Sequence, residues 1–442
     1  MTERPAADAA LSGSTIESVP ERREPVRVPA SRYTDPDFAA AELEHVWTRT
    51  WQIACSIDHV SDPGDWFEYS VGPYSVVIVR GEEGVLRAFQ NVCLHRGNEL
   101  CRAQGSGLTE LRCGYHRWAW DLTGRLREVP SRKGFGVISS DDYSLIDVAV
   151  DTWGPLVWIN LDTNAMPLVD YLDDMPADTA WAELDEFRCS ALLSTALACN
   201  WKTLIDGFSE TYHVQGIHPE MLPMVDDVNS PQQVWNHVGK LSQPYGIASP
   251  RLRDVSHQQV WDGFVEVMGG RIGIHDPDEA GPAPDVEPGE PFRDHLAERI
   301  RAEYQRRHGV DLDRFATEHL LDLSQYNVFP NVTILVFGDM LQIVKSRPGP
   351  DPDHCVMDVM AFDRARSGAD RSSPVTVTMA KDDVDLGLVL NQDLGNIERA
   401  QRGLHQPGFD QLSLSGEECR IINLHRNLER YIPDAARSGA SP

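Results

Sequence analysis

Two short motifs in this chain each place one cysteine beside one histidine. The first is Cys93-Leu94-His95, and the second, seventeen residues later, is Cys113-Gly114-Tyr115-His116. Two thiolates and two neutral imidazoles are the donors of a [2Fe–2S] cluster whose one iron is held by sulfur and the other by nitrogen. Glycines close to both motifs would let backbone N–H groups turn toward the buried sulfides. The pattern predicts a cluster of this kind.

A structural zinc site is the main alternative for the same four side chains. Zinc fingers usually bring two cysteines first and two histidines afterwards. Here each motif supplies one cysteine and one histidine, which suits split ligation of two irons. A buried structural histidine would explain His95 or His116 singly, but not all four positions.

A second set of metal-binding side chains lies further along the chain. Asp206, Glu210 and His213 share one face of a predicted helix. Gly216 can end this helix, so the chain can fold back and bring His218 to the same ion. Two histidines and one carboxylate form the facial triad of non-haem Fe(II) oxygenases. An amphipathic helix with exposed histidines and acids is the alternative interpretation.

The elements that must position these motifs divide the chain into three parts: an N-terminal extension over 1–39, a small all-β domain over 40–165, and a mixed domain over 166–442. Residues 1–30 carry charges and prolines without periodicity, which predicts a loosely attached segment. Alternating β-rich runs and glycine turns predict the all-β domain. In the mixed domain, the patterns predict helices over 199–214, 383–404 and 416–431, and strands over 332–337, 341–346 and 356–362.

Composition excludes several classes of protein. The 442 residues carry a formal net charge of −28, which argues against nucleic acid or an anionic membrane as a partner. No apolar run approaches the ~20 residues that span a bilayer, and residues 1–29 lack the apolar core of a secretory signal, so we expect a cytoplasmic location. The chain also lacks a dinucleotide-binding fingerprint, and any reducing equivalents must come from a separate protein.

The first two motifs resemble the Rieske signature of ring-hydroxylating oxygenases, C-x-H-R-G and C-x-Y-H-G-W. Two positions depart from it: Gly114 stands where proline is common, and Arg117 where glycine is common. The resemblance implies that all four donors bind the cluster, the cysteines one iron and the histidines the other. Neither departure affects a ligand, but Arg117 could alter the surface on which the electron donor docks.

Residues 200–219 resemble the family motif N-W-K-x3-E-N-x2-E-x-Y-H-x4-H-P, with Asp206-Gly207 in place of Glu-Asn. The resemblance implies that His213 and His218 bind Fe(II). It also implies that Glu210 bridges an iron-site histidine to a cluster histidine of a neighbouring subunit. Naphthalene-dioxygenase-like members have Asp at this bridging position. Glu is usual in a branch that includes carnitine- and choline-type monooxygenases.

The third ligand of the mononuclear iron has four candidates, Asp382, Asp383, Asp385 and Asp393. Residues 392–404 are similar to the family's late segment E-D-x3-C-E-x-V-Q-x-G-L, which favours Asp393, with Asp383 second. Two further acids, Asp226 and Asp227, could face a cationic substrate, but we expect them to be exposed to solvent.

The resemblance covers roughly residues 40–435. It implies an α+β fold: an N-terminal all-β Rieske [2Fe–2S] domain of three small antiparallel sheets, and a helix-grip (START-like) catalytic domain with an antiparallel sheet. The implied function is the terminal oxygenase of a multicomponent system, of the kind that acts in aromatic hydrocarbon catabolism. It would use O2 to hydroxylate, dihydroxylate or demethylate a small organic substrate. Electrons would come from NAD(P)H through a separate reductase or ferredoxin, and the chain would form a homotrimer. A Rieske-type electron-transfer protein is the alternative.

Overall fold

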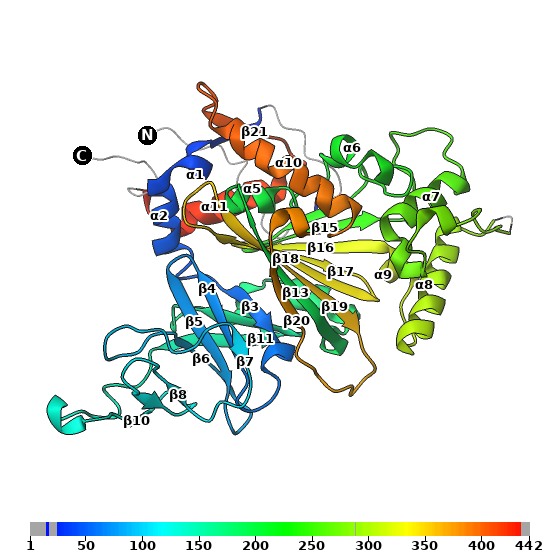
Figure 1. The fold of residues 1–442 in the computed structure, drawn as a ribbon. Coiled ribbons are helices and arrows are strands. Elements are labelled where there is room, and N and C mark those ends of the chain that lie inside the picture. Colours follow the sequence, from blue (N-terminus) through cyan, green and yellow to red (C-terminus); the bar gives the residue numbers. More distant parts are fainter. Residues whose placement is uncertain (1–14, 17–23, 288, 435–442) are drawn as a thin grey trace.

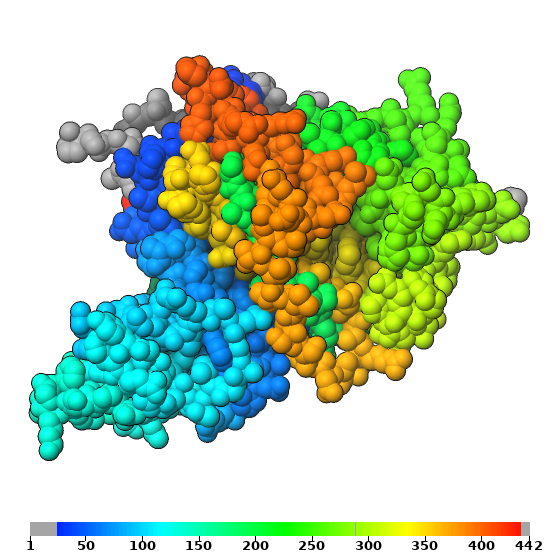
Figure 2. Space-filling model, viewed as in Figure 1, coloured from blue at the N-terminus to red at the C-terminus, as the bar shows by residue number. Residues whose placement is uncertain are grey.

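The computed structural model describes residues 15–16, 24–287 and 289–434. The chain forms a smaller all-β half, drawn in blue and cyan at the lower left of Figure 1, and a larger half of strands and helices. Figure 2 shows the smaller half as a lobe that projects from the larger one. The predicted α+β fold class is confirmed.

The smaller half consists of antiparallel strands. Residues 50–165, which are described throughout, form a seven-stranded sheet in the order β3-β12-β11-β6-β5-β4-β7 and a three-stranded sheet in the order β10-β9-β8. One strand, β11, pairs with β6 through Asp147 and Val148 and with β12 through 149–153, which joins two of the three expected sheets. The strands are β3 (Gln52–Ser56), β4 (Trp66–Val71), β5 (Tyr74–Arg80), β6 (Leu86–Gln90), β7 (Gln104–Gly105), β8 (Leu111–Arg112), β9 (Ala119–Trp120), β10 (Leu126–Glu128), β11 (Asp147–Trp153) and β12 (Leu156–Asn160).

The larger half is built on one long sheet. Within the described residues its strand order is β1-β14-β15-β16-β17-β18-β19-β13-β20, and neighbouring strands are antiparallel except β13 and β20, which are parallel. The strands are β1 (Thr15–Ile16), β13 (Phe187–Leu197), β14 (Gln232–Val234), β15 (Val238–Pro244), β16 (Asp322–Val328), β17 (Val332–Val336), β18 (Met340–Pro348), β19 (Cys355–Arg364) and β20 (Val375–Met379).

Helices cover this sheet, with α5, α10 and α11 lying above it in the view of Figure 1 and α7, α8 and α9 at one end. The helices are α1 (Ser31–Thr34), α2 (Pro36–His45), α3 (Leu168–Tyr171), α4 (Met175–Asp178), α5 (Trp201–Asp206), α6 (Val214–Ile217), α7 (His257–Met268), α8 (Phe292–His308), α9 (Thr317–Leu321), α10 (Leu388–Leu404) and α11 (Cys419–Tyr431). No helix in the described parts of the chain is long and apolar enough to cross a lipid bilayer.

The segment before the all-β half is tied to the larger half. Residues 26–29 form β2, which pairs with β21 (Gln411–Leu414), so the expectation of a loosely attached segment is wrong for these residues. Residues 1–14 and 17–23 lie outside the described chain. In α2, the buried Glu42 carboxylate is 2.6 Å from Lys202 Nζ and accepts a hydrogen bond from Trp201 Nε1 on α5. The segment therefore supports α5, which leads into the second predicted metal site.

The two halves share one continuous core. Its buried residues include Trp158 and Val76 of the smaller half together with Trp201 and Ile343 of the larger half. The buried Lys345 ammonium on β18 donates hydrogen bonds to the carbonyl oxygens of residues 53 and 54 on β3, at 2.8 and 3.1 Å. These contacts fix the two halves relative to each other.

Candidate metal centres

Two loops at the far end of the smaller half carry the cysteine–histidine motifs, and both loops have the same backbone form. In the first, Cys93 N–H donates to the carbonyl of residue 98, and Gly97 N–H donates to the carbonyl of Cys93. In the second, Cys113 N–H donates to the carbonyl of residue 118, and Arg117 N–H donates to the carbonyl of Cys113. Gly97 has a φ of 74° and Arg117 a φ of 65°. The signature's usual glycine at 117 is thus explained by a left-handed backbone, which arginine occupies here at a cost.

In these loops the two histidine side chains lie next to each other, and so do the two cysteine side chains. The His95 and His116 rings lie 4.5 Å apart at an interplanar angle of 80°, and both are partly exposed, whereas both cysteines are buried. Burial raises the pKa of the Cys113 thiol, but the N–H groups of Tyr115 and His116 and the side chains of Cys93 and Asn98 together outweigh it, so this pKa lies below its usual value. Burial raises the pKa of the neighbouring Cys93 thiol. Backbone N–H groups aimed at sulfur favour a thiolate. Paired thiolates and paired imidazoles suit a cluster with split ligation.

The second predicted site also comes together. One ligand atom each from His213, His218 and Asp393 lies within 4.8 Å of the other two. Asp393 Oδ1 is 2.9 Å from His218 Nε2 and 3.7 Å from His213 Nε2. His213 and His218 flank α6, and Asp393 projects from α10. Two imidazole nitrogens and a carboxylate oxygen converging in this way are a donor set that fits a divalent iron.

Each histidine has a hydrogen-bond partner at its other ring nitrogen. His213 Nδ1 is 2.7 Å from Glu210 Oε1, and His218 Nδ1 is 2.6 Å from Gln392 Oε1. Both partners accept, so each Nδ1 carries a proton, and the Nε2 atoms, which face Asp393, are the ring nitrogens that could bind a metal ion. Burial lowers the pKa of His218, but the hydrogen bond and charge of Asp393 outweigh it, and the pKa lies above its usual value.

The local helix differs from the prediction. Instead of running over 199–214, α5 ends at Asp206, and turns follow until α6 begins at residue 214. Ser209 Oγ donates to the Ile205 carbonyl at 2.7 Å, and Glu210 Oε2 accepts from His213 N–H at 3.0 Å. These side chains satisfy backbone groups that a longer helix would have paired. Glu210 and His213 therefore meet through a turn rather than along a helix face.

Of the four aspartates considered for the carboxylate, the structure brings only Asp393 to the histidines. Asp393 is 6% exposed. Asp382 and Asp383 lie on an exposed helical turn before α10, and Asp385 accepts hydrogen bonds from Gly387 N–H and the Asn391 side chain. Helix α10 begins at Leu388, five residues later than predicted, after a Gly387 whose φ is 84°.

Asp226 and Asp227 are buried, 9% and 5% exposed, so the expectation of solvent exposure is wrong. Asp226 accepts hydrogen bonds from the N–H groups of the two residues after Asp227 and holds a turn. Asp227 pairs with Arg251 at 2.8 Å and accepts from Ser249 Oγ at 2.6 Å. Both carboxylates therefore form hydrogen bonds or ion pairs with other groups of the protein.

Sequence reasoning missed two partners of the site. Gln392 carries no signal of its own in the sequence, because its contact with His218 depends on how α10 packs. Tyr33 of α1 donates to Asp206 Oδ2 at 2.6 Å. Burial raises the pKa of Asp206 to about 7, with the carboxylates of Glu418 and Glu210 acting in the same direction against the Tyr33 hydrogen bond. Asp206 is thus held by the N-terminal segment behind the site rather than pointing to a metal.

Comparisons with known proteins agree with both halves of this arrangement. The family model of the Rieske [2Fe-2S] domain matches residues 50–146, and that of the ring hydroxylating alpha subunit (catalytic domain) matches residues 173–434. A carnitine monooxygenase oxygenase subunit of Escherichia coli K12 is 30% identical over 53% of this chain and 63% of its own length. A benzene 1,2-dioxygenase subunit alpha of Pseudomonas putida is 32% identical over 42% of this chain and 43% of its own length. The alignments thus span less than two thirds of these relatives.

Solved structures share the fold over nearly the whole chain. A quaternary ammonium Rieske monooxygenase in complex with L-carnitine has a TM-score of 0.65 at 18% identity, covering 93% of this chain and 97% of that one. Naphthalene 1,2-dioxygenase with indole bound has a TM-score of 0.64 at 18% identity, covering 92% of both chains. The chain therefore belongs to the family of ring-hydroxylating oxygenase alpha subunits, with a Rieske [2Fe–2S] domain in its smaller half and the family's catalytic domain in its larger half.

Proposed function

We propose that the chain is the terminal oxygenase component of a multicomponent Rieske oxygenase. The observation that carries this proposal is the presence of two separate donor sets, paired Cys and His in the smaller half and the His213–His218–Asp393 triad in the larger half. A pure electron-transfer protein would need the first set alone. Electron transfer alone would not explain the triad, whose two imidazoles are oriented by hydrogen bonds.

The chain's own residues hold, orient and enclose the two centres. Cys93, Cys113, His95 and His116 would hold the cluster, and the triad would hold Fe(II). When bound, the cluster supplies single electrons and Fe(II) supplies the site at which O2 is activated. Glu210 and Gln392 keep the Nδ1 protons of the histidines in place, and so keep both Nε2 atoms free to bind metal.

We further propose that electrons cross between subunits. In one chain the cluster loops near β8 and the triad near α6 and α10 lie at opposite ends of the molecule (Figure 1). The cluster histidines are partly exposed, and Glu210 is partly buried beside His213. A head-to-tail homotrimer would bring Glu210 to His116 or His95 of the partner subunit. A separate NAD(P)H-dependent reductase, or a ferredoxin, would reduce the cluster, and this reductant implies a cytoplasmic location.

The substrate is a small organic molecule that the enzyme hydroxylates, dihydroxylates or demethylates. The similar proteins include a carnitine and a glycine betaine monooxygenase, although a benzene dioxygenase is also among them. Glu at position 210 is shared with the carnitine-type branch. We therefore place methylated amines first among the candidate substrates, followed by aromatic acids and steroids.

Metal analysis and oxygen consumption test the proposal together. Anaerobically reconstituted protein should show a Rieske-type spectrum and about three irons per chain, two in the cluster and one at the triad. With a surrogate reductase and NADH, at least one substrate class should stimulate O2 uptake and yield an oxygenated product. Two irons per chain, with O2 uptake that no substrate stimulates, would instead support an electron carrier.

A further inference from the structure

Four lysine and arginine side chains are buried in the described parts of the chain, and one of them lacks a counter-charge. Three form ion pairs with carboxylates: Lys202 with Glu42 at 2.6 Å, Lys345 with Asp358 at 3.5 Å, and Arg364 with Glu186 at 2.9 Å. The fourth, Arg420 on α11, is 2% exposed and pairs with no carboxylate of the described residues. A buried charge is costly unless it is paired, so Arg420 indicates an anion that the protein itself does not supply.

Neutral amide oxygens hold the Arg420 guanidinium where the other buried cations have carboxylates. Its Nε donates to Gln232 Oε1 at 3.2 Å, and its Nη1 donates to Gln325 Oε1 at 2.7 Å and to the Asn327 side chain. Its Nη2 has no hydrogen-bond partner among the described residues. Guanidinium Nη2 carries two N–H groups, and a buried donor without an acceptor is unfavourable. This side of the guanidinium therefore lacks both an acceptor and a negative charge.

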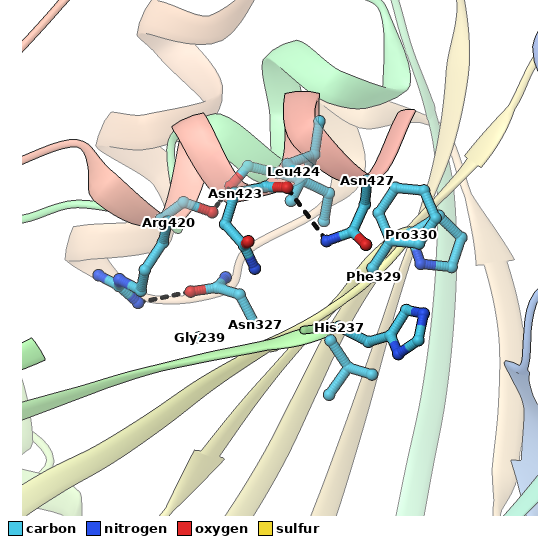
Figure 3. Close-up of a pocket in the computed structure, with 12 residues that line it drawn as sticks. His237, Gly239, Asn327, Phe329, Pro330, Arg420, Asn423, Leu424 and Asn427 are labelled. Atoms are coloured by element: carbon cyan, nitrogen blue, oxygen red, sulfur yellow. Dashed lines mark hydrogen bonds between the residues drawn. The ribbon is translucent and has the colours of Figure 1, made fainter. Parts of the chain in front are cut away.

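Arg420 lines a narrow cavity of about 20 Å³ between α11 and the sheet. In Figure 3, Arg420 and Asn327 lie at one end of this cavity, and His237 and Phe329 at the other. A Cβ added at Gly239 on β15 would lie 2.9 Å from Arg420 Cγ, so glycine is needed for the arginine to lie this close to the sheet. The cavity has room for about one water molecule. A halide ion is close to this size, whereas a carboxylate, phosphate or sulfate group is larger.

Glu210 is the carboxylate whose charge acts on Arg420, but it is engaged elsewhere. Burial lowers the pKa of Arg420 to about 10, while Cys419 and Glu210 act in the opposite direction, so the guanidinium is charged near pH 7. Both oxygens of Glu210 contact His213, Oε1 at 2.7 Å from Nδ1 and Oε2 at 3.0 Å from the backbone N–H. Arg420 also lies in the first turn of α11, where the helix dipole disfavours a cation. The local field therefore favours a small anion beside Arg420.

We propose that the cavity beneath α11 binds one halide ion, chloride under ordinary conditions, as the counter-ion of Arg420. The N–H groups of Nη2 donate to the ion, and the amide oxygens of Gln232, Gln325 and Asn327 hold the rest of the guanidinium. The ion thereby strengthens the contact between α11 and strands β14 to β16. Asn327 also donates to the Phe208 carbonyl at 3.1 Å, so the halide site adjoins the segment that leads to Glu210. The site depends on neither metal centre and does not rest on the proposed oxygenase activity.

Bromide locates the ion directly, because it resembles chloride and scatters X-rays anomalously. Crystals of the full-length chain grown in sodium bromide should show an anomalous difference peak beside Arg420 Nη2 at the bromine absorption edge. A water molecule at this place, with no anomalous peak, would overturn the proposal. The measurement needs no substrate, reductase or turnover, so failure of the halide site is distinguishable from failure of the proposed function.

Thermal unfolding at constant ionic strength tests the binding in solution. Replacing gluconate, an anion too large for the cavity, by chloride should raise the Tm of the wild type by about 2 °C or more, because the ion binds only the folded chain. Arg420→Met removes the charge but keeps a long side chain, and should abolish this chloride-dependent shift.

The matched control is Arg364→Met, which also removes a buried arginine, but one that is paired with Glu186. We expect this control to have a lower Tm than the wild type in both salts and to retain the chloride-dependent shift. Equal Tm values of the wild type in the two salts, or a full shift in Arg420→Met, would contradict the halide site. If Arg420→Met does not fold, the bromide peak and the wild-type shift decide the question.

Discussion

His218 and Asp393 are separated by 175 residues in the sequence, and yet His218 Nε2 lies 2.9 Å from Asp393 Oδ1. The contact depends on α10 packing against α5 and α7, which places Asp393 beside the C-terminal end of α6. The two side chains are 1% and 8% exposed, so their hydrogen-bonding groups depend on each other rather than on bulk water. Their mutual approach, together with His213, is the arrangement from which the mononuclear iron site is inferred.

The first prediction concerns the carboxylate ligand. We expect Asp393→Ala to lose the mononuclear iron and retain the cluster, because one of three donors is removed while the other half of the chain is untouched. Iron analysis should fall from about three to about two per chain, with the cluster spectrum unchanged. Asp383→Ala is the matched control, since Asp383 is exposed and should keep all the iron. If Asp383→Ala lost the mononuclear iron and Asp393→Ala kept it, Asp383 would be the carboxylate ligand.

The second prediction concerns Gln392, whose amide oxygen accepts from His218 Nδ1. We expect Gln392→Ala to weaken iron binding at the triad about 10- to 100-fold, because removal of an outer hydrogen-bond partner frees the imidazole to rotate and change tautomer. Competition with a colorimetric chelator measures the affinity. The exposed Gln406, just after α10, provides the control Gln406→Ala. Equal iron affinities in the two variants would rule out this role.

The third prediction concerns Glu210. Glu210→Gln should bind both metals but lose nearly all substrate-coupled turnover, because the amide cannot supply the charge of the carboxylate between His213 and the partner's cluster. Product formation and rapid-mixing reoxidation of the cluster would be measured. Glu266→Gln, on the exposed face of α7, should behave like the wild type. Normal coupled activity in Glu210→Gln would contradict the bridge.

The fourth prediction concerns pH and Asp206. Its folded-state pKa of about 7 lies above the ordinary value of 3.8, so the folded chain binds this proton more tightly than the unfolded chain. The resulting stability is present at low pH and is lost as the pH rises through 7, a change of up to about 4 kcal/mol. Asp206→Asn stays neutral throughout. Its free energy of unfolding relative to wild type should therefore increase from about pH 5 to about pH 8, and a flat difference would refute the raised pKa.

The fifth prediction concerns the left-handed backbone at Arg117. Replacing Arg117 by glycine should raise the free energy of unfolding of the smaller half by about 1 kcal/mol, because glycine adopts a φ of 65° without the Cβ clash. Chemical denaturation followed by cluster absorbance measures this. Arg96→Gly, one position before the corresponding Gly97 of the other loop, should give no such gain. Destabilisation by Arg117→Gly would show that the arginine side chain makes a compensating contact.

The amino-acid order alone predicts the two candidate donor sets, because most of their members lie in short motifs whose spacing and turn residues are local properties. Such motifs predict six of the donors, and the pattern that follows Asp393 favours it over Asp383; the six are Cys93, His95, Cys113, His116, His213 and His218. The all-β half and the strands over 332–362 were also predictable, since alternation and glycine turns act within a few residues.

Other features depended on contacts between distant parts of the chain. Gln392 contacts His218 because α10 packs against α5 and α7, and residues 26–29 form a strand because they pair with β21. Local periodicity predicted a helix through Glu210, but side chains that satisfy backbone groups end α5 at Asp206. Asp226 and Asp227 are buried because Arg251, Ser249 and nearby N–H groups satisfy them. Burial and partner choice are decided by long-range packing, and no short stretch of sequence contains that information.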